Sequence, residues 1–247
     1  MLWVDERGSG PAIVLVHNGA MDARAWNGQM EPFSRSHRVV RYDSPGFGRS
    51  DALMNDYLET DVLLSLLDER KLSRVALVGN SRGGRIAIDF ALAHPQRVSA
   101  LVLVCAAVSG YRLSASSPTQ NAAEEEALER RDAEAIADVT LEIWGRLGAE
   151  PHIRELIVAN ALADLTTEHE QPPGQMAVDH LEELHAPTLV ISGDHDAPPL
   201  EKLGDLLERR ISGAERVRFA DSDHFPNLRE PERFNRVVLD FLQRASA

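Results

Sequence analysis

VALVGNSRGG, residues 75–84, is a short apolar run that ends in a serine flanked by glycines. A run of this length predicts a buried strand, and the apolar spacing of residues 85–92 predicts a helix directly after it. Gly79 and Gly83 allow the helix to turn back tightly against the strand, because a side chain at either position would clash. The stretch therefore predicts a sharp strand-to-helix turn with Ser81 at its tip, above the free N–H groups of the helix N-terminus.

Strands and helices alternate on both sides of this turn. This alternation is typical of an α/β fold, in which a mostly parallel central sheet is flanked by helices and carries its sites at the carboxyl ends of the strands. About seven strands are expected in all, including the strand before Ser81 and a short strand within residues 1–10. The other expected strands are 12–16, 38–43, 98–108, 187–193 and 215–220, and the expected helices are 23–34, 57–71, 200–211 and 231–245. The alternating polarity of 215–220 places that strand near a sheet edge.

Residues 109–184 interrupt the alternation. Their helical patterns fall at 122–139, 141–147 and 152–165, and the polar segment 166–174 follows. We expect this region to be a helical lid over the carboxyl edge of the sheet, inserted into a core domain made of residues 1–108 and 185–247. A helical bundle unrelated to the site is the alternative.

Composition excludes several classes of partner and cofactor. The formal net charge of −13 argues against nucleic acid and anionic membranes. Cys105 is the single cysteine, so no intrachain disulfide or cysteine-based metal site is expected, and no set of His, Asp and Glu has metal-ligand spacing. Without a signal-peptide layout or an apolar run approaching 18 residues, we expect a cytoplasmic monomer or homodimer that acts on a small molecule, with no cofactor or metal.

Ser81 needs a base before its hydroxyl becomes a useful nucleophile, and the base needs a carboxylate that fixes its tautomer. Asp196 and His224 follow the strands 187–193 and 215–220, where parallel strands bring side chains together. Asp194 follows the same strand as Asp196 and is an alternative acid. The sequence thus predicts a nucleophile, an acid and a base in the order Ser81, Asp196, His224.

Segments spread over nearly the whole chain resemble the α/β-hydrolase superfamily. They are HNGAMDARAW at 17–26, RYDSPGFGRSD at 41–51, GNSRGG at 79–84, SGDHD at 192–196 and SDHFPNLREPERF at 222–234. The resemblance implies Ser81 as nucleophile and His224 as base. It implies Asp196 as the acid, because the family places that residue three positions after a glycine, here Gly193.

An oxyanion hole is also expected, since the tetrahedral intermediate of acyl transfer needs hydrogen-bond donors. The backbone N–H groups of Arg82 and Gly19 are the candidates, with His17 holding the loop. Because Asn18 replaces the usual glycine after His17, the loop resembles the enol-lactonase-like branch, in which an aspartate and a tryptophan recur at positions 22 and 26. The candidate substrate contacts are Asn18, Asp22, Arg82, Trp144 and Phe225.

Two residues depart from the family pattern. Arg82 follows the nucleophile, where bulky apolar residues are common. Its side chain either holds a substrate carboxylate or forms an internal pair with Asp22 or with a glutamate of the lid. Asp223 stands where the family usually has a glycine before the base; it either raises the basicity of His224 or faces solvent, and we expect it to face solvent.

These features predict a serine hydrolase that cleaves a small carboxylic ester or lactone through an acyl-enzyme. Carbon–carbon bond hydrolysis of a dienone-type acid and cofactor-free perhydrolysis are alternatives that use the same three residues. A ligand-binding or signalling protein with slow turnover is a third alternative.

Overall fold

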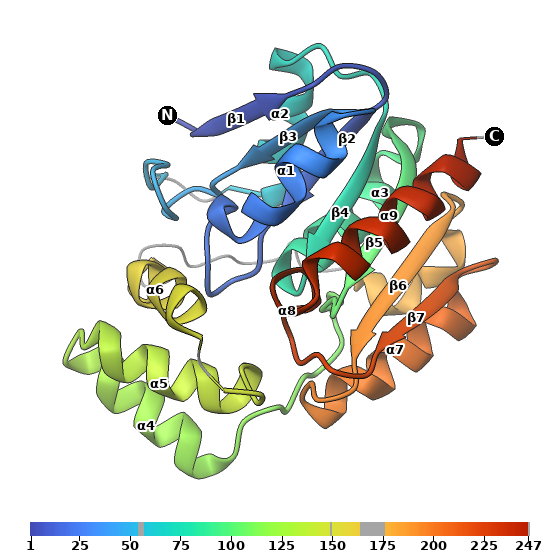
Figure 1. Cartoon of the computed structure of the whole chain (residues 1–247). Coiled ribbons are helices and arrows are strands. Elements are labelled where there is room, and N and C mark those ends of the chain that lie inside the picture. Colours follow the sequence, from blue (N-terminus) through green and yellow to red (C-terminus); the bar gives the residue numbers. More distant parts are fainter. Residues whose placement is uncertain (54–56, 149, 164–175, 247) are drawn as a thin grey trace.

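The central element is one sheet of seven strands in the order β1-β3-β2-β4-β5-β6-β7, seen in the computed structural model (Figure 1). The structure describes residues 1–53, 57–148, 150–163 and 176–246, so the segment 166–174 lies outside the described residues. Only β1 pairs antiparallel, with β3, and the other neighbouring strands are parallel. The strands are β1 (Val4–Arg7), β2 (Ala12–Val16), β3 (Arg38–Tyr42), β4 (Val75–Asn80), β5 (Val98–Val104), β6 (Thr188–Gly193) and β7 (Glu215–Phe219). The predicted mostly parallel sheet, the number of strands and the edge position of β7 are confirmed.

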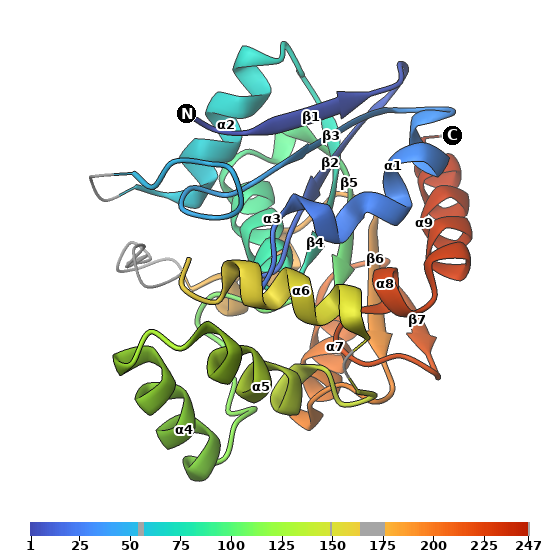
Figure 2. The ribbon, with the colours of Figure 1, turned by 60° about the vertical axis from the view of Figure 1, so that its left-hand side comes forward.

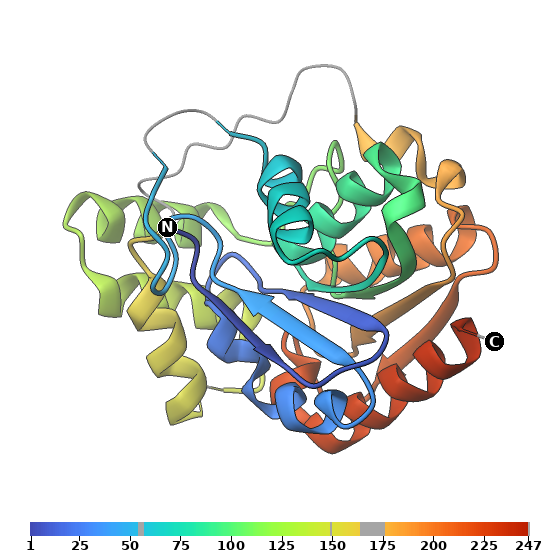
Figure 3. The same cartoon turned by 90° about the horizontal axis from the view of Figure 1, so that it is seen from above.

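Helices cover both faces of the sheet (Figure 3). One face carries α2 (Glu59–Glu69), α3 (Arg82–Ala93) and α7 (Pro198–Arg210), and the other carries α1 (Asn27–Ser34) and α9 (Pro231–Ala245). Successive side chains of a strand point to opposite faces. In β2, Val14 and Val16 accordingly pack toward α3, while Ile13 and Leu15 pack toward α1 and α9. Burial on both faces explains why the central strands are apolar without alternation.

Short helical turns connect these elements. They are η1 (Ala23–Trp26), η2 (Pro95–Arg97), η4 (Ala177–Asp179), η5 (Leu181–Glu183) and α8 (Pro226–Arg229). In the part of the chain that the structure describes, no helix has the length and apolar character needed to cross a membrane.

The insertion between β5 and β6 contains α4 (Pro118–Glu129), α5 (Ala133–Trp144) and α6 (Pro151–Asn160). These helices lie beside the carboxyl ends of the parallel strands (Figures 1 and 2). One apolar cluster joins α5 and α6 to the core: Met21, Ala25 and Phe225 pack with residues of these helices that include Ala137 and Ile153. The insertion is thus packed onto the edge of the sheet where the candidate residues lie.

Several predicted boundaries are wrong. The predicted break between the helices 122–139 and 141–147 is absent, because α5 runs without interruption from Ala133 to Trp144. The strand 98–108 ends at Val104, because Cys105 adopts a φ of +43° that breaks the extended backbone. The predicted helix 122–139 is two helices: Arg131 has a φ of +52°, and the Asp132 side chain accepts a hydrogen bond from the Ala135 N–H to begin α5. The charged residues around this cap have the pattern of one continuous exposed helix surface. The sequence pattern therefore did not reveal the break between α4 and α5.

The turn between β4 and α3 has almost no free space. Ser81 has a φ of +54°, a strained conformation for a residue with a side chain. A Cβ atom at Gly79 would lie 2.2 Å from the carbonyl oxygen of Gly83, and one at Gly83 would lie 2.2 Å from that of Val16. Because both obstacles are backbone atoms, the helix can pack this close to the sheet only with glycine at these positions.

We expect Gly83→Ala to lower the free energy of unfolding by about 3 kcal/mol, because the new methyl group would overlap a backbone carbonyl. Gly28→Ala is the control: its Cβ would meet Pro231 at an ordinary 3.6 Å, and alanine favours α1. That variant should match the wild type or gain about 0.5 kcal/mol. Urea unfolding measures both, and equal stabilities would contradict the steric argument.

Candidate active site

A cavity of about 650 Å³ lies between the carboxyl ends of the strands and the insertion. Ser81 enters its lining from the β4–α3 turn and His224 from the loop after β7. The insertion supplies the opposite wall, with Ile136, Trp144 and Ile157 among the lining residues. The predicted nucleophile and base thus share one cavity, of a size that accommodates a small organic ligand.

Asp196 is the hydrogen-bond partner of His224. The imidazole Nδ1 lies 2.9 Å from one carboxylate oxygen and 3.1 Å from the other, and both side chains are buried. Since an ionised carboxylate can only accept, Nδ1 carries the proton, and Nε2 of the neutral ring is left as the basic atom. Asp194 instead accepts a hydrogen bond from Arg218 on the protein surface, so the structure joins Asp196, and not Asp194, to the histidine.

Asn80 connects the loops around Ser81, and the sequence analysis did not single it out. Its amide nitrogen donates to the carbonyl oxygens of Val104 and His224, at 3.0 and 3.2 Å. Its amide oxygen accepts from the Asn18 side chain at 2.9 Å. The loops that carry Asn18, Ser81 and His224 are therefore linked through one buried amide. A polar residue at the end of an otherwise apolar strand was the available signal.

The predicted oxyanion donors belong to adjacent backbone segments. Arg82 is the first residue of α3, where N–H groups have no acceptor within the helix. Gly19 lies beside it, since a Cβ atom on Gly19 would be 3.5 Å from Cδ of Arg82. Both residues line the cavity that contains Ser81. This placement is compatible with two N–H donors that converge on a negatively charged oxygen.

His17 fixes the loop that carries Gly19. Its ring is fully buried, Nε2 accepts the N–H of Ser44 at 2.9 Å, and Nδ1 donates to the carbonyl oxygen of Asn18 at 2.7 Å. Burial and the nearby positive charge of Arg82 lower the pKa of His17 from 6.5 to about 4. The ring is therefore neutral near pH 7, with both nitrogens used to hold backbone.

Comparison with known proteins assigns the family. The model of the alpha/beta hydrolase family matches residues 13–237. The chain belongs to this family. It is 30% identical to the 2-hydroxy-6-oxononadienedioate/2-hydroxy-6-oxononatrienedioate hydrolase of Burkholderia vietnamiensis, over 94% of this chain and 87% of that protein. The protein is thus a hydrolytic enzyme.

Solved structures give the same family. The enol-lactonase from Burkholderia xenovorans LB400 is 26% identical with a TM-score of 0.80, over 98% of this chain and 96% of that one. An N-acyl homoserine lactone degrading enzyme is 29% identical with a TM-score of 0.80, over 97% of this chain and 96% of that one. The similarity to the enol-lactonase agrees with the resemblance seen at the loop after β2.

Asp22 of this hydrolase connects the loop after β2 with α6. Its buried carboxylate pairs with Arg24 at 2.6 Å and accepts a hydrogen bond from Asn160 of α6 at 2.9 Å. Burial opposes ionisation, but the hydrogen bonds from Arg24 and Asn160 hold the pKa of Asp22 below its usual value. Among the described residues that line the cavity, Asn160 is present and Asp22 is not. We infer that Asp22 contributes to loop structure, and not to substrate contact.

The Arg82 side chain has a partner that the sequence analysis did not name. Its guanidinium forms an ion pair with Glu59 of α2, and Arg85 pairs with the second oxygen of the same carboxylate. The guanidinium also lies 4.7 Å from the centre of the Phe47 ring. Glu59 is neither of the partners expected from the sequence, because it lies on α2. Both arginines still line the cavity, so the structure leaves them within reach of a ligand.

Asp223 does not face solvent, contrary to the expectation. It is fully buried, its carboxylate pairs with Arg229 at 2.7 Å, and it accepts the N–H of Leu147 at 3.2 Å. A buried carboxylate requires such partners, because leaving it unpaired would be costly. Sequence pattern could not reveal this, because Leu147 approaches only through the folding of the insertion.

Aromatic rings enclose His224. The Trp144 ring centre lies 4.6 Å from the imidazole centre, and Phe225 meets the imidazole edge-on at 5.4 Å. Both residues line the cavity, as does Asn18, whose amide is already engaged by Asn80 and by the N–H of Ala20. Trp144 and Phe225 are therefore the apolar side chains of the cavity lining that lie beside the base, where a substrate would contact them.

Cys105 lies close to the acid and the base. Ligand atoms of Cys105, Asp196 and His224 fall within 4.8 Å of one another, a grouping found once among the described residues. Metal binding needs a thiolate and a free imidazole nitrogen. Burial raises the pKa of the Cys105 thiol well above its usual value, which disfavours the thiolate, and the Asp196 carboxylate is already engaged by Nδ1 of His224. These three residues do not fit a resident metal.

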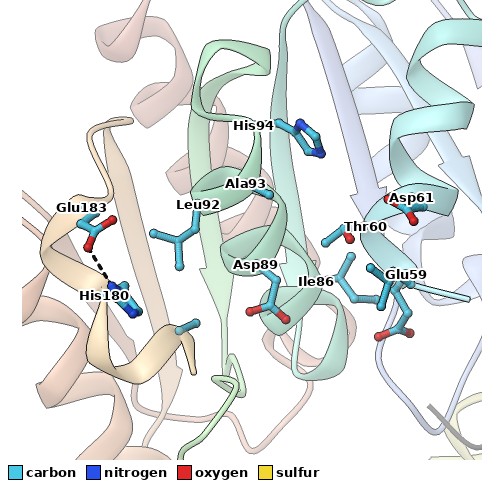
Figure 4. Close-up of a pocket in the computed structure, with 12 residues that line it drawn as sticks. Glu59, Thr60, Asp61, Ile86, Asp89, Leu92, Ala93, His94, His180 and Glu183 are labelled. Atoms are coloured by element: carbon cyan, nitrogen blue, oxygen red, sulfur yellow. Dashed lines mark hydrogen bonds and ion pairs between the residues drawn. The ribbon is translucent and has the colours of Figure 1, made fainter. Parts of the chain in front are cut away.

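A second cavity of about 520 Å³ lies over the outer face of α2 and α3 (Figure 4). Asp89, His94 and the hydrogen-bonded pair His180–Glu183 contribute to its lining, and none of the described lining residues is a serine. Glu59 also lines it, while the same carboxylate binds Arg82 and Arg85 of the first cavity. The first cavity, which combines a strained serine with an Asp–His pair, is therefore the candidate active site.

The lowered pKa of His17 predicts a pH-dependent stability. The unfolded histidine binds a proton below about pH 6.5 and the folded one only below about pH 4. The contribution of the neutral His17 ring to the free energy of unfolding is therefore fully present above pH 6.5 and is lost as the pH falls toward 4. Between pH 7 and 4.5 this should cost roughly 2 to 3 kcal/mol of unfolding free energy.

Urea titrations of the wild type and His17→Gln at the two pH values measure this loss. The unfolding free energy of the variant should differ less between pH 7 and pH 4.5 than that of the wild type, because glutamine does not titrate. His195→Gln removes an exposed histidine and should retain the wild-type difference. An unchanged difference in His17→Gln would refute the assignment of a neutral, buried ring.

Proposed function

We propose that this alpha/beta hydrolase cleaves a small carboxylic ester or lactone through an acyl-enzyme formed on Ser81. The observation that carries the proposal is the Asp196–His224 pair, which lines the same cavity as a strained, glycine-flanked serine. The buried hydrogen bond from Nδ1 of His224 to Asp196 fixes the ring orientation and tautomer, so that Nε2 faces the serine as the proton acceptor. The similarity to an enol-lactonase and to a second lactone-degrading enzyme supports this class of substrate.

In the proposed reaction, Ser81 Oγ attacks the carbonyl carbon while Nε2 of His224 accepts the hydroxyl proton. Asp196 holds the ring and stabilises the imidazolium. The N–H groups of Gly19 and Arg82 stabilise the resulting oxyanion. When the intermediate collapses, the carbon–oxygen bond to the leaving alcohol breaks, and His224 returns the proton to that oxygen. Water, activated by the same histidine, then hydrolyses the acyl-enzyme and frees Ser81.

The insertion would act as the lid that selects the substrate. Its contribution to the cavity is mainly apolar, through Ile136, Trp144 and Ile157. Apolar walls with few polar groups are typical of sites for small organic molecules. Trp144 and Phe225 would contact the acyl or alkoxy group beside the base, and the guanidinium of Arg82 would lie near the oxyanion loop.

Carbon–carbon bond hydrolysis is a second candidate, favoured by the named relatives. The Burkholderia vietnamiensis relative carries the name of a dienedioate hydrolase, and a similar protein of Cupriavidus pinatubonensis is 31% identical over 93% of this chain. The same three residues would then act on a dienone-type acid. Turnover of such an acid, compared with turnover of simple esters and lactones, separates the two. Negligible turnover of every substrate would favour a ligand-binding role.

A fluorophosphonate probe should label Ser81 in the wild type, because the probe reacts with an activated serine hydroxyl. Ser81→Ala should abolish both labelling and ester hydrolysis, with the fold unchanged by circular dichroism. Peptide mapping by mass spectrometry locates the label. Absence of labelling in the folded wild type, or a label on another serine, would reject the proposed nucleophile.

The neighbouring carboxylates provide a matched pair of variants. Asp196→Asn should lower kcat on the order of 10⁴-fold, because an amide in place of the carboxylate favours the wrong histidine tautomer. Asp194→Asn should lie within about twofold of the wild type, because its partner Arg218 is on the surface. Steady-state kinetics on one ester measures both. A larger effect at Asp194 would reverse the assignment.

A further inference from the structure

The loop that carries His224 is bound directly to the insertion. The His224 N–H donates to the carbonyl oxygen of Trp144 at 3.4 Å, and the Leu147 N–H donates to the Asp223 carboxylate at 3.2 Å. Arg229 donates to the carbonyl oxygen of Gly148 at 2.6 Å and pairs with Glu150 at 3.1 Å. These contacts fall on Trp144 at the end of α5, on Leu147 and Gly148 beyond it, and on Glu150, the residue before α6.

Asp223 and Arg229 form the centre of this attachment. The Asp223 carboxylate is fully buried and the Arg229 side chain is 6% exposed, so solvent cannot replace either partner. One carboxylate oxygen accepts from Arg229 Nε at 3.2 Å and from the Phe225 N–H at 3.3 Å. The other accepts from the second guanidinium nitrogen at 2.7 Å and from Leu147. Every donor lies on the His224 loop, on α8 or on the insertion.

We propose that Asp223 and Arg229 are positioning residues: together they hold the end of α5, with Trp144, against His224. This inference rests on the proposed role of His224 as the base. Asp223 adjoins the histidine in the chain, and Arg229 spans the distance from that carboxylate to the insertion. Through this pair, one end of the insertion and the base become a single rigid unit.

The pair constrains both the base and the substrate wall. Trp144 packs 4.6 Å from the imidazole, so a shift of α5 would release one face of the ring. The same tryptophan lines the cavity. A displacement of about 1 Å in such a group can lower the rate on the order of 100-fold. The position of the insertion would thus be coupled to catalysis without any contact between Asp223 and the substrate.

Asp223→Asn tests the attachment. Asparagine has one oxygen where the carboxylate has two, so one of its sides must present an NH₂ group to a donor of Arg229 and to the N–H of either Phe225 or Leu147. Hydrogen exchange of the segment that contains Trp144 and Leu147, followed by mass spectrometry at a temperature well below the Tm, should be about tenfold faster in the variant. Arg229→Lys keeps the charge but loses the planar fork, and should give a smaller acceleration.

Arg216→Gln is the matched control. The Arg216 side chain is 5% exposed and pairs with Asp205, so its replacement also breaks the ion pair of a buried arginine, but one that joins β7 to α7 and not to the insertion. It should lower the Tm without changing exchange at Trp144 and Leu147. Equal acceleration in this control, or unchanged exchange in Asp223→Asn, would overturn the proposal.

Activity per active site tests the coupling to catalysis. After titration of reactive Ser81 with a fluorophosphonate, kcat per titrated site should fall on the order of 10- to 100-fold in Asp223→Asn and stay at the wild-type value in Arg216→Gln. A role limited to stability would lower the Tm and leave kcat per titrated site unchanged, which would overturn the positioning role. Failure of the wild type to react would reject the proposed function, and the exchange measurement would then test the attachment alone.

Discussion

The contact of two backbones at the β4–α3 turn is the constraint on which this structure depends. With glycine at 79 and 83, the first turn of α3 approaches β2 and β4 so closely that a single methyl group would overlap a carbonyl oxygen. This proximity forces Ser81 into a positive φ and lifts its side chain into the cavity. It also points the free N–H groups of the helix N-terminus at the same space. Strand order then brings the loops after β6 and β7 to this point, with Asp196 and His224.

Buried polar groups fix the positions of the surrounding loops relative to one another. A neutral His17 ties the loop after β2 to that after β3, and Asn80 ties it to the His224 loop. Each of these groups has several hydrogen bonds, because a buried polar atom without a partner is costly. Such networks specify a single arrangement, since a shift of one loop would leave atoms in the others unpaired. The site is therefore rigid where the chemistry is proposed to occur.

The insertion is joined to the core through both apolar and ionic contacts. The cluster of Met21, Ala25 and Phe225 with α5 and α6 provides burial, and Asp223 with Arg229 provides a directional attachment. Burial alone is non-directional and would tolerate sliding of the helices. The ion pair, with its bonds to the Leu147 N–H and the Gly148 carbonyl, fixes one end of the insertion beside His224. The position of His224 therefore depends on two parts of the chain that are far apart in sequence.

The sequence by itself determined the sheet, the turn at Ser81 and the identity of the candidate acid and base. These depend on local signals: apolar runs, glycines at fixed offsets, and polar residues directly after strands. Only the tertiary structure decided the partners of the buried charges. Glu59 meets Arg82 and Arg85 across α2 and α3, and Leu147 meets Asp223 across the insertion. The sequence does not show whether a charged residue is buried or which residue it pairs with, because both depend on the packing of distant segments.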